Sequence, residues 1–170
     1  MRWMWIDRIL ELSPGERIVA IKNLASCEDH LKAHFEDDGE WRALPLHPAS
    51  LIVEGMAQTA GTLVGHASEF REKVILAKVT NATLEYDVLP GEVIRFTATV
   101  ERLDGAGAST RGIVDCRLAG SSEWTRIGAI DLMFAHADQN LSGLEFPEHN
   151  FVFHEDFRTL LRISGFEANF

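Results

Sequence analysis

A single long apolar run that begins at Pro48 constrains the fold of this chain more than any other feature. Proline suits the first turn of a helix because its φ is preset and it has no N–H to lose. Apolar residues recur on more than one face between residues 51 and 64, so we expect a helix over 48–66 that is buried nearly all round. Glycines at 55, 61 and 65 lower helix propensity and indicate that something packs very close to the backbone.

Three polar side chains follow one another at four-residue spacing along this helix, namely Glu54, Gln58 and Thr62. Residues at this spacing lie on one stripe of the helix. A carboxylate in a buried helix is costly unless it is paired, which makes a buried Glu54 a candidate for a functional site. A solvent-exposed stripe explains the same spacing equally well, so helix periodicity alone leaves both interpretations open.

Size and charge exclude several classes of protein. A chain of 170 residues fits one domain, and its formal net charge of −10 argues against nonspecific binding to nucleic acid or to anionic membranes. No apolar run reaches the roughly 18 residues of a membrane-spanning helix, and the first residues show no signal-peptide pattern. Cys27 and Cys116 form no CxxC motif, so we expect a reduced, cytoplasmic protein.

Segments with strand periodicity lie on both sides of the helix. A turn at Ser13–Glu16 separates two β-prone runs, the second near residues 17–24. After the helix, strands are expected over 74–80, 93–103, 110–118 and 124–134, and residues 82–88 should continue the first of them as a strand or as a bent extension of it. The short turns between them favour an antiparallel meander. We therefore expect an α+β domain over residues 1–138, in which an antiparallel sheet wraps around one long central helix and leaves its edges open to a second subunit.

The end of the chain has a different pattern. Residues 139–170 are expected to form a C-terminal extension with a short helix over 155–163. Phe157, Leu160 and Leu161 fall on one side of that helix, so the extension should pack on the domain through them. We expect no catalytic group in it.

Three blocks of sequence carry a resemblance to a known family. They are IDRILEL with RIVAIKN near the N-terminus, His34-Phe35 with LIVEGMAQ on the helix, and AKVTNAT with VLPG and LMF on the strands. In this order they resemble the hot-dog-fold 3-hydroxyacyl-[acyl-carrier-protein] dehydratases of fatty-acid synthesis, over residues 6–136. The resemblance implies a hot-dog fold and conversion of a 3-hydroxyacyl thioester on acyl carrier protein to a trans-2-enoyl thioester. It also implies a homodimer or higher oligomer that needs no cofactor or metal.

The resemblance assigns catalysis to His34 and Glu54. Dehydration needs a base for the C2 proton, which suits a histidine with an ordinary pKa of about 6.5. Glu54 would protonate the departing hydroxyl, and Gln58, one turn later, would orient its carboxylate. The backbone N–H groups near Ala49 and Ser50, at the helix N-terminus, would hold the thioester oxygen. His30 and His34 have no evident third ligand, so no metal site is expected.

The chain departs from the family pattern in two places. His34-Phe35 leads into an acidic loop at 36–42 that is several residues longer than is usual in the family, and Ala49 stands where the family has glycine. Two alternatives therefore stay open: a hot-dog acyl thioesterase, in which Glu54 activates water, and a noncatalytic acyl-binding or assembly homologue. An acidic carrier protein would bind a basic cluster near the opening of the tunnel that takes the acyl substrate. We expect this cluster to be drawn from Arg42, Arg71, Lys73 and Lys78.

Overall fold

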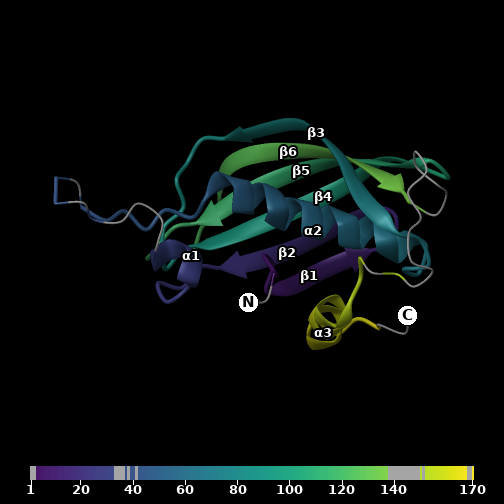
Figure 1. Ribbon diagram of the computed structural model, residues 1–170, viewed down its shortest axis with the longest axis horizontal. Coiled ribbons are helices and arrows are strands. Elements are labelled where there is room, and N and C mark those ends of the chain that lie inside the picture. Colours follow the sequence, from purple (N-terminus) through teal and green to yellow (C-terminus); the bar gives the residue numbers. More distant parts are fainter. Residues whose placement is uncertain are drawn as a thin grey trace.

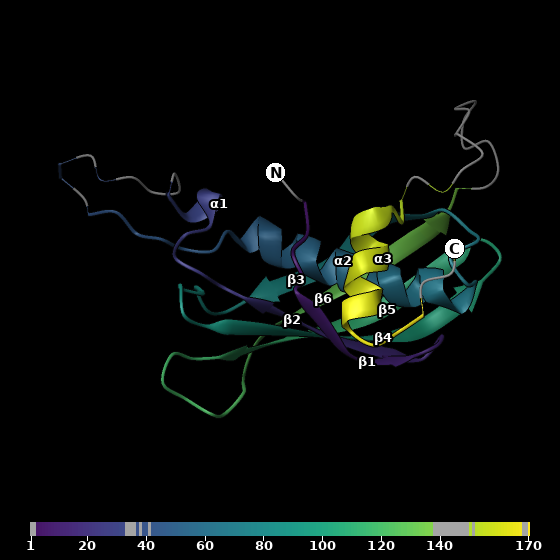
Figure 2. The same cartoon turned by 90° about the horizontal axis from the view of Figure 1, so that it is seen from below.

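The computed structural model describes residues 3–32, 37, 39–40, 42–137, 150, 152–167 and 170. Six strands form one antiparallel sheet in the order β1-β2-β4-β5-β6-β3, and helix α2 lies across one of its faces (Figures 1 and 2). The elements are β1 (Arg8–Ser13), β2 (Arg17–Asn23), α1 (Asp29–Lys32), α2 (Ala49–Ala67), β3 (Val74–Leu84), β4 (Val93–Asp104), β5 (Gly107–Arg117), β6 (Thr125–His136) and α3 (Glu155–Ile163). The expected sheet around one long helix is confirmed.

Helix α2 begins directly after Pro48, as the sequence predicts. Pro48 has φ −57°, and its carbonyl oxygen accepts the first hydrogen bond of the helix from the Leu51 N–H at 2.9 Å. The side of α2 that faces the sheet buries Met56 and Leu63 completely. Each such side chain contributes about 1.5–3 kcal/mol when it leaves water, so the helix is held mainly by tertiary packing.

The three helix glycines fall in three different environments. A Cβ added at Gly55 would lie 2.6 Å from Cζ of Phe96, and one added at Gly65 would lie 2.4 Å from Cζ of Phe153. The expected close packing is therefore confirmed at both positions, by the sheet at Gly55 and by the C-terminal segment at Gly65. At Gly61 the nearest atom would be Cε1 of Phe134 at 3.5 Å, an ordinary contact.

The strand order corrects the expected meander. Of the four strands that follow α2, only β4, β5 and β6 lie side by side in chain order, whereas β3 pairs with β6 at the far edge. Helix α2 crosses the sheet and delivers the chain to that edge, so residues 85–92 must return to the middle of the sheet before β4 begins. Residues 82–84 extend the first expected strand within β3, but the expected end at residue 88 is wrong, because β3 ends at Leu84. Val88 is fully buried, and its carbonyl oxygen accepts a hydrogen bond from the His47 N–H at 2.9 Å.

The outer edge of the sheet at β3 is largely exposed. This strand of 11 residues pairs with β6 on one side, and no other described strand pairs with it on the other. Leu76 and Val79 expose more than a third of their surface there. An unpaired edge of this length invites pairing with another chain, and the homodimer stays a prediction.

The C-terminal helix has the bounds that the sequence predicts, and Phe157, Leu160 and Leu161 are buried. Ser164 Oγ accepts a hydrogen bond from the Ile9 N–H at 2.9 Å, which ties the end of α3 to β1. The division at residue 138 stays a prediction, because residues 138–149 lie outside the described part. The short helix α1 was not expected in the irregular stretch 25–47. None of the described helices combines the length and apolar character needed to span a membrane.

Candidate active site

Glu54 lies on the second turn of α2 and is half-buried. Its Oε1 accepts hydrogen bonds from Nε2 of Gln58 at 3.0 Å and from Nε1 of Trp3 at 3.2 Å. Both donors are neutral and both reach the same oxygen. Among the described residues, no cation forms an ion pair with this carboxylate. The second oxygen, Oε2, is therefore the one that can carry a proton or meet a ligand.

Gln58 fixes the position of this carboxylate. It is 7% exposed, and its Oε1 accepts a hydrogen bond from the Trp5 N–H at 2.8 Å. Its amide nitrogen also donates to the Trp3 carbonyl oxygen at 3.2 Å. One buried side chain thus joins the N-terminal segment to α2 and orients Glu54. The contact that the sequence predicts between Gln58 and Glu54 is present, and its catalytic role stays a prediction.

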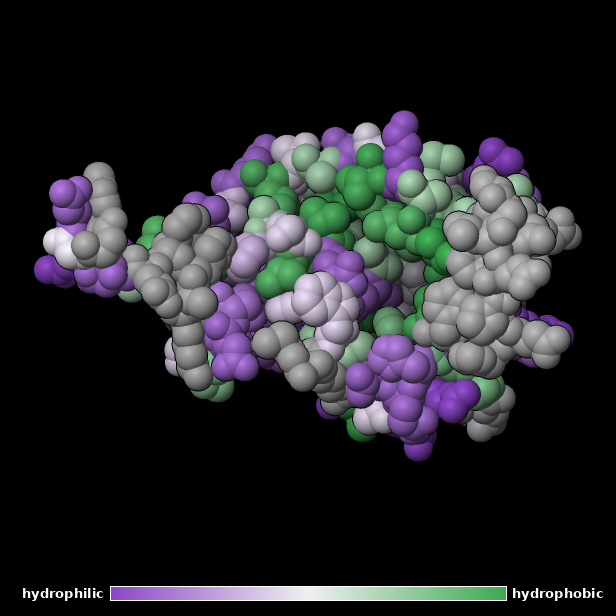
Figure 3. Space-filling view, viewed as in Figure 1, coloured by the Kyte–Doolittle hydropathy of each residue, from purple (hydrophilic) through white to green (hydrophobic). Residues whose placement is uncertain are grey.

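A cavity of about 310 Å³ opens beside Glu54. Its polar lining at one end comes from Trp3, Glu54 and Gln58. The rest of the lining is mostly apolar and consists of Ala57, Gly61, Val74, Leu76, Phe134, Val152, Phe153, His154 and Phe157. Figure 3 shows this face of the molecule hollowed near its centre, with hydrophobic residues gathered above the hollow. A mostly apolar cavity with a few convergent polar groups is typical of a small-molecule site.

The N-terminus of α2 has the residues expected to hold an oxyanion. Ala49 and Ser50 are exposed in the first turn, where backbone N–H groups lack partners within the helix. Ala49 is not among the residues with positive φ, so alanine replaces the family's glycine without backbone strain. Ser50, Glu54 and Gln58 share one stripe by their spacing. Neither Ala49 nor Ser50 lines the cavity, so their binding role stays a prediction.

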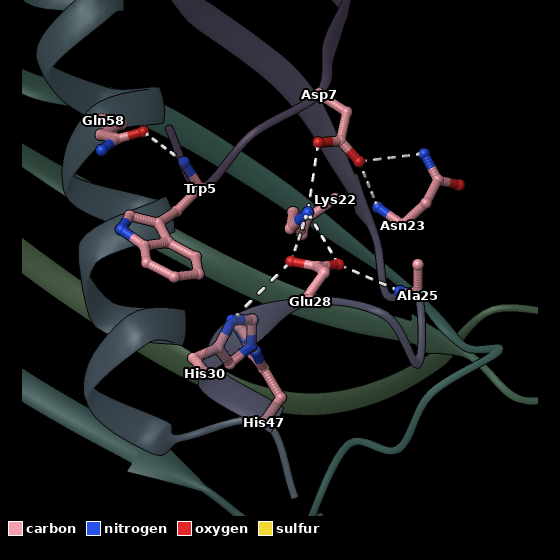
Figure 4. A network of polar contacts seen from close by, with 9 residues as sticks. All are labelled: Trp5, Asp7, Lys22, Asn23, Ala25, Glu28, His30, His47 and Gln58. Carbon is pink, nitrogen blue, oxygen red and sulfur yellow. Dashed lines mark hydrogen bonds and ion pairs between the residues drawn. The ribbon is translucent and has the colours of Figure 1, made fainter. Parts of the chain in front are cut away.

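A second cluster of polar residues lies beside the N-terminus of α2, on the other side of Trp5 from Gln58 (Figure 4). His30 Nε2 and His47 Nδ1 are 2.9 Å apart, and the Trp5 ring packs edge-on against His30 with the ring centres 5.0 Å apart. Lys22 Nζ lies 3.3 Å from Oδ1 of Asp7 and 3.1 Å from Oε2 of Glu28. The buried His47 and the buried Lys22 were not predicted to meet any of these partners, which come from distant parts of the sequence.

His34, the predicted base, lies outside the described residues, so its distance from Glu54 stays a prediction. Two functional contacts were missed by sequence reasoning. Trp3 donates to Glu54, and His154, expected at the surface or in packing, lines the cavity. No signal in the sequence points to either, because both depend on where the chain termini pack. No three histidine, cysteine, aspartate or glutamate side chains of the described part gather as metal ligands.

The expected basic cluster needs correction. Lys73 is only 9% exposed, because it lies at the start of β3 against the body of the domain, so it cannot serve as a surface cation. Arg71 is exposed, but its guanidinium lies 3.3 Å from the carboxylate of Glu69. Arg42 and Lys78 remain as exposed cations without that neutralising neighbour in the described contacts.

Comparisons with known proteins agree with the resemblance. The family model of the FabA-like domain matches residues 2–123. The 3-hydroxyacyl-[acyl-carrier-protein] dehydratase FabZ of Ruminiclostridium cellulolyticum is 30% identical over 124 residues, which cover 71% of this chain and 83% of that protein. The protein of the same name from Halalkalibacterium halodurans is 31% identical over 134 residues, covering 78% of this chain and 87% of its own.

Solved structures show the same fold at low sequence identity. The dehydratase heterocomplex ApeI:P from Xenorhabdus doucetiae superposes with a TM-score of 0.60 at 15% identity, covering 81% of this chain and 85% of that chain. A thioesterase superfamily member from Thermus thermophilus superposes with a TM-score of 0.56 at 18% identity, covering 74% and 84%. The hot-dog fold expected from the resemblance is confirmed.

Proposed function

The chain belongs to the FabA-like family of hot-dog-fold dehydratases, and from this premise we propose that it converts a 3-hydroxyacyl thioester on acyl carrier protein to a trans-2-enoyl thioester. The observation that carries the proposal is Glu54, a half-buried carboxylate at the polar end of an otherwise apolar cavity. Both of its hydrogen-bond donors reach Oε1, and no described residue donates to Oε2.

In the proposed reaction, the C2–H bond breaks and its proton passes to His34. The electron pair forms the C2–C3 double bond by way of an enolate whose oxygen is held by the N–H groups at the start of α2. The C3–O bond then breaks, and Glu54 protonates the departing hydroxyl so that water leaves. Loss of water is redox-neutral overall, so the reaction needs no oxidant or reductant, and the side chains of the protein suffice for the proton transfers.

We infer that the working unit is a homodimer or higher oligomer joined through the β3 edge. The exposed Leu76 and Val79 and the unpaired length of β3 support this inference. In the family that the chain resembles, the histidine and the acid of one site come from different subunits. A partner would thus bring its own loop to the cavity beside Glu54. Light scattering at micromolar concentration tests the inference, and a monomer would contradict it.

Arg42 and Lys78 support, as a reduced cluster, the proposed contact with an acidic carrier protein. We place the reaction in the cytoplasm, because both cysteines are free thiols and structural disulfides are rare in reducing compartments. Arg42→Glu with Lys78→Glu should slow turnover of carrier-linked substrate at low salt. The same pair of changes should leave turnover of a pantetheine thioester unchanged, which serves as the control.

The decisive experiment follows two products from one 3-hydroxyacyl thioester, the enoyl thioester and free thiol. Dehydration yields the first without the second. Hydrolysis, the activity of the thioesterase alternative, yields free thiol. Wild type, His34→Ala and Glu54→Gln are compared, and each substitution should lower the rate of enoyl formation by about 10²–10⁴. If wild type binds the thioester and forms neither product at any chain length, the noncatalytic acyl-binding alternative replaces the proposal.

A further inference from the structure

The far wall of the cavity beside Glu54 is built by a part of the chain that the family model does not reach. That model ends at residue 123, whereas Val152, Phe153, His154 and Phe157 all line the cavity. We call these four residues the C-terminal wall. Helix α3, which carries the last of them, lies on the same side of the sheet as α2 (Figure 2). The extension was expected to pack on the domain without a catalytic group, and four of its residues line the cavity.

The C-terminal wall is held firmly in position. The Phe153 ring packs against Phe70 with the ring centres 4.8 Å apart, and Gly65 leaves the space that its ring occupies. Before the wall, the side-chain amide of Asn150 donates to the Phe70 carbonyl oxygen at 2.9 Å. Leu161, one turn after Phe157 on the same side of α3, is fully buried. A wall with these anchors can set a fixed limit on what the cavity admits.

The cavity has a polar end and an apolar end along α2. Glu54 and Gln58 lie at the polar end, and Gly61 lies seven residues after Glu54, about 10 Å further along the helix at 1.5 Å per residue. Phe134 lies near Gly61 and Phe153 near Gly65, so Phe134 and part of the C-terminal wall line the cavity beyond Gln58. A volume of about 310 Å³ is at the low end for ligand cavities. The shape fits an acyl tail whose reacting carbons lie at Glu54.

We propose that the C-terminal wall limits the length of the acyl chain that the cavity admits and restricts this protein to short 3-hydroxyacyl thioesters. This inference rests on the proposed function for the reacting end of the substrate. It concerns the far end, where the tail meets Phe157 and Phe153. Each methylene that enters an apolar site strengthens binding about fourfold, so affinity rises with chain length until the tail reaches the wall and then levels off.

The test measures binding of saturated acyl-pantetheine thioesters, from butyryl to dodecanoyl, by titration calorimetry with the full chain. These probes cannot be dehydrated, so the result does not depend on catalysis. Phe157→Ala removes a ring from the wall and should move the plateau to chains about two carbons longer, strengthening binding of the longest chains about 15-fold. Leu160→Ala is the matched control, because Leu160 is buried in the same helix and does not line the cavity.

Gly61→Ala supplies the opposite change. The new methyl group would make only an ordinary contact with Phe134, at 3.5 Å, and alanine raises helix propensity, so the variant should fold. It narrows the apolar end, so the plateau should come at a shorter chain. Opposite shifts in Phe157→Ala and Gly61→Ala, with none in Leu160→Ala, would support the proposal.

Three results would contradict the proposal that the C-terminal wall limits the acyl chain length. The first is an unchanged plateau in a folded Phe157→Ala variant, as judged by circular dichroism. The second is an equal shift in Leu160→Ala, which would show a general loosening of α3. The third is a wild type that binds no acyl-pantetheine at any length. If wild type binds with a plateau but forms no enoyl thioester, the proposed dehydration fails while the wall stands.

Discussion

Two groups of polar residues flank Trp5, and their carboxylates are stabilised in different ways. The cavity cluster consists of Trp3, Glu54 and Gln58, in which neutral N–H groups donate to one carboxylate oxygen. The lysine cluster consists of Asp7, Lys22 and Glu28, in which one buried ammonium lies between two carboxylates. Trp5 joins the two clusters. Its backbone N–H donates a hydrogen bond to Gln58, and its ring packs against His30, which lies beside Glu28.

The difference separates a carboxylate available for chemistry from carboxylates committed to structure. Glu28 accepts from Lys22 and also from the Ala25 N–H at 3.0 Å, so its lone pairs are occupied within the fold. Asp7 likewise accepts from the Asn23 N–H at 2.7 Å. Glu54 lines a cavity and has only one oxygen engaged by described donors. Burial of a charge costs free energy in both clusters, but only the lysine cluster offsets that cost with an opposite charge.

The strongest test of this comparison exchanges one carboxylate for an amide in each cluster. Glu54→Gln keeps the shape and can still accept from Trp3 and Gln58, but it cannot deliver an acidic proton. We expect turnover of a 3-hydroxyacyl thioester to fall by about 10²–10⁴, with the free energy of unfolding within about 0.5 kcal/mol of wild type. Glu28→Gln should do the reverse, lowering stability and preserving turnover per folded molecule.

Steady-state kinetics and urea denaturation on both variants give the four values needed. The comparison breaks if Glu28→Gln lowers turnover as much as Glu54→Gln does. It also breaks if Glu54→Gln unfolds at markedly lower urea, because Glu54 would then be a structural carboxylate.

Removing the buried cation tests the lysine cluster directly. Lys22 exposes only 8% of its side chain, and Lys22→Met leaves Asp7 and Glu28 facing each other without an opposite charge. Breaking a buried pair in this way typically destabilises a protein by about 3–5 kcal/mol, and the partial exposure of Asp7 favours about 3. Thermal unfolding measures the loss. Lys78→Met, at an exposed position on β3, should change stability by less than about 0.5 kcal/mol.

A smaller effect is expected from the indole that donates to Glu54. Trp3→Phe removes this N–H together with the five-membered ring of the indole and keeps a six-membered aromatic ring at the position. A hydrogen bond to a charged group contributes about 1.5–3 kcal/mol, but Trp3 is 56% exposed and water can replace its donor. We therefore expect kcat to fall by up to about tenfold with little change in stability. Trp124→Phe, which changes a ring stacked on Arg95, should leave kcat at the wild-type value.

The sequence predicts best what depends on local periodicity. The start of α2 after Pro48 and both bounds of α3 could be read from helix signals, because capping and amphipathic spacing act within a few residues. Gln58 beside Glu54 follows from the same spacing. The place of β3 at the far edge could not be read, because strand order depends on where the chain leaves α2.

The candidate site was predictable only in part for the same reason. Glu54 and Gln58 share one helix, whereas Trp3 reaches Glu54 from 51 residues away and Phe157 reaches the cavity from the other terminus. The periodicity of α3 predicts that Phe157 is buried but not what it is buried against. His34 lies outside the described residues, so its assignment rests on the resemblance alone.

A further carboxylate, Glu92, shows that hydrogen bonds from neutral donors are not enough to identify a functional site. Like Glu54, Glu92 accepts hydrogen bonds from neutral donors, namely Tyr86 Oη at 2.8 Å and the Leu89 N–H at 2.8 Å. Unlike Glu54, it is only 4% exposed and does not line the cavity beside α2. Neutral donors alone therefore do not make a functional site; an opening to a cavity is also needed. Cys116, 3.9 Å from Glu92, reports whether this region is closed.

Burial and the neighbouring Glu92 raise the pKa of Cys116 to about 12. Because the thiolate is the reactive form, Cys116 should stay unmodified by iodoacetamide at neutral and mildly alkaline pH, while the exposed Cys27 reacts. The raised pKa also means that its contribution to stability is complete below about pH 9 and is lost as the pH rises towards 12. Mass spectrometry of the native protein should find one modified cysteine, and two after denaturation. Rapid modification of Cys116 in the native state would show that the Glu92 region opens to solvent, and Glu54 would no longer differ from Glu92 by its access to ligand.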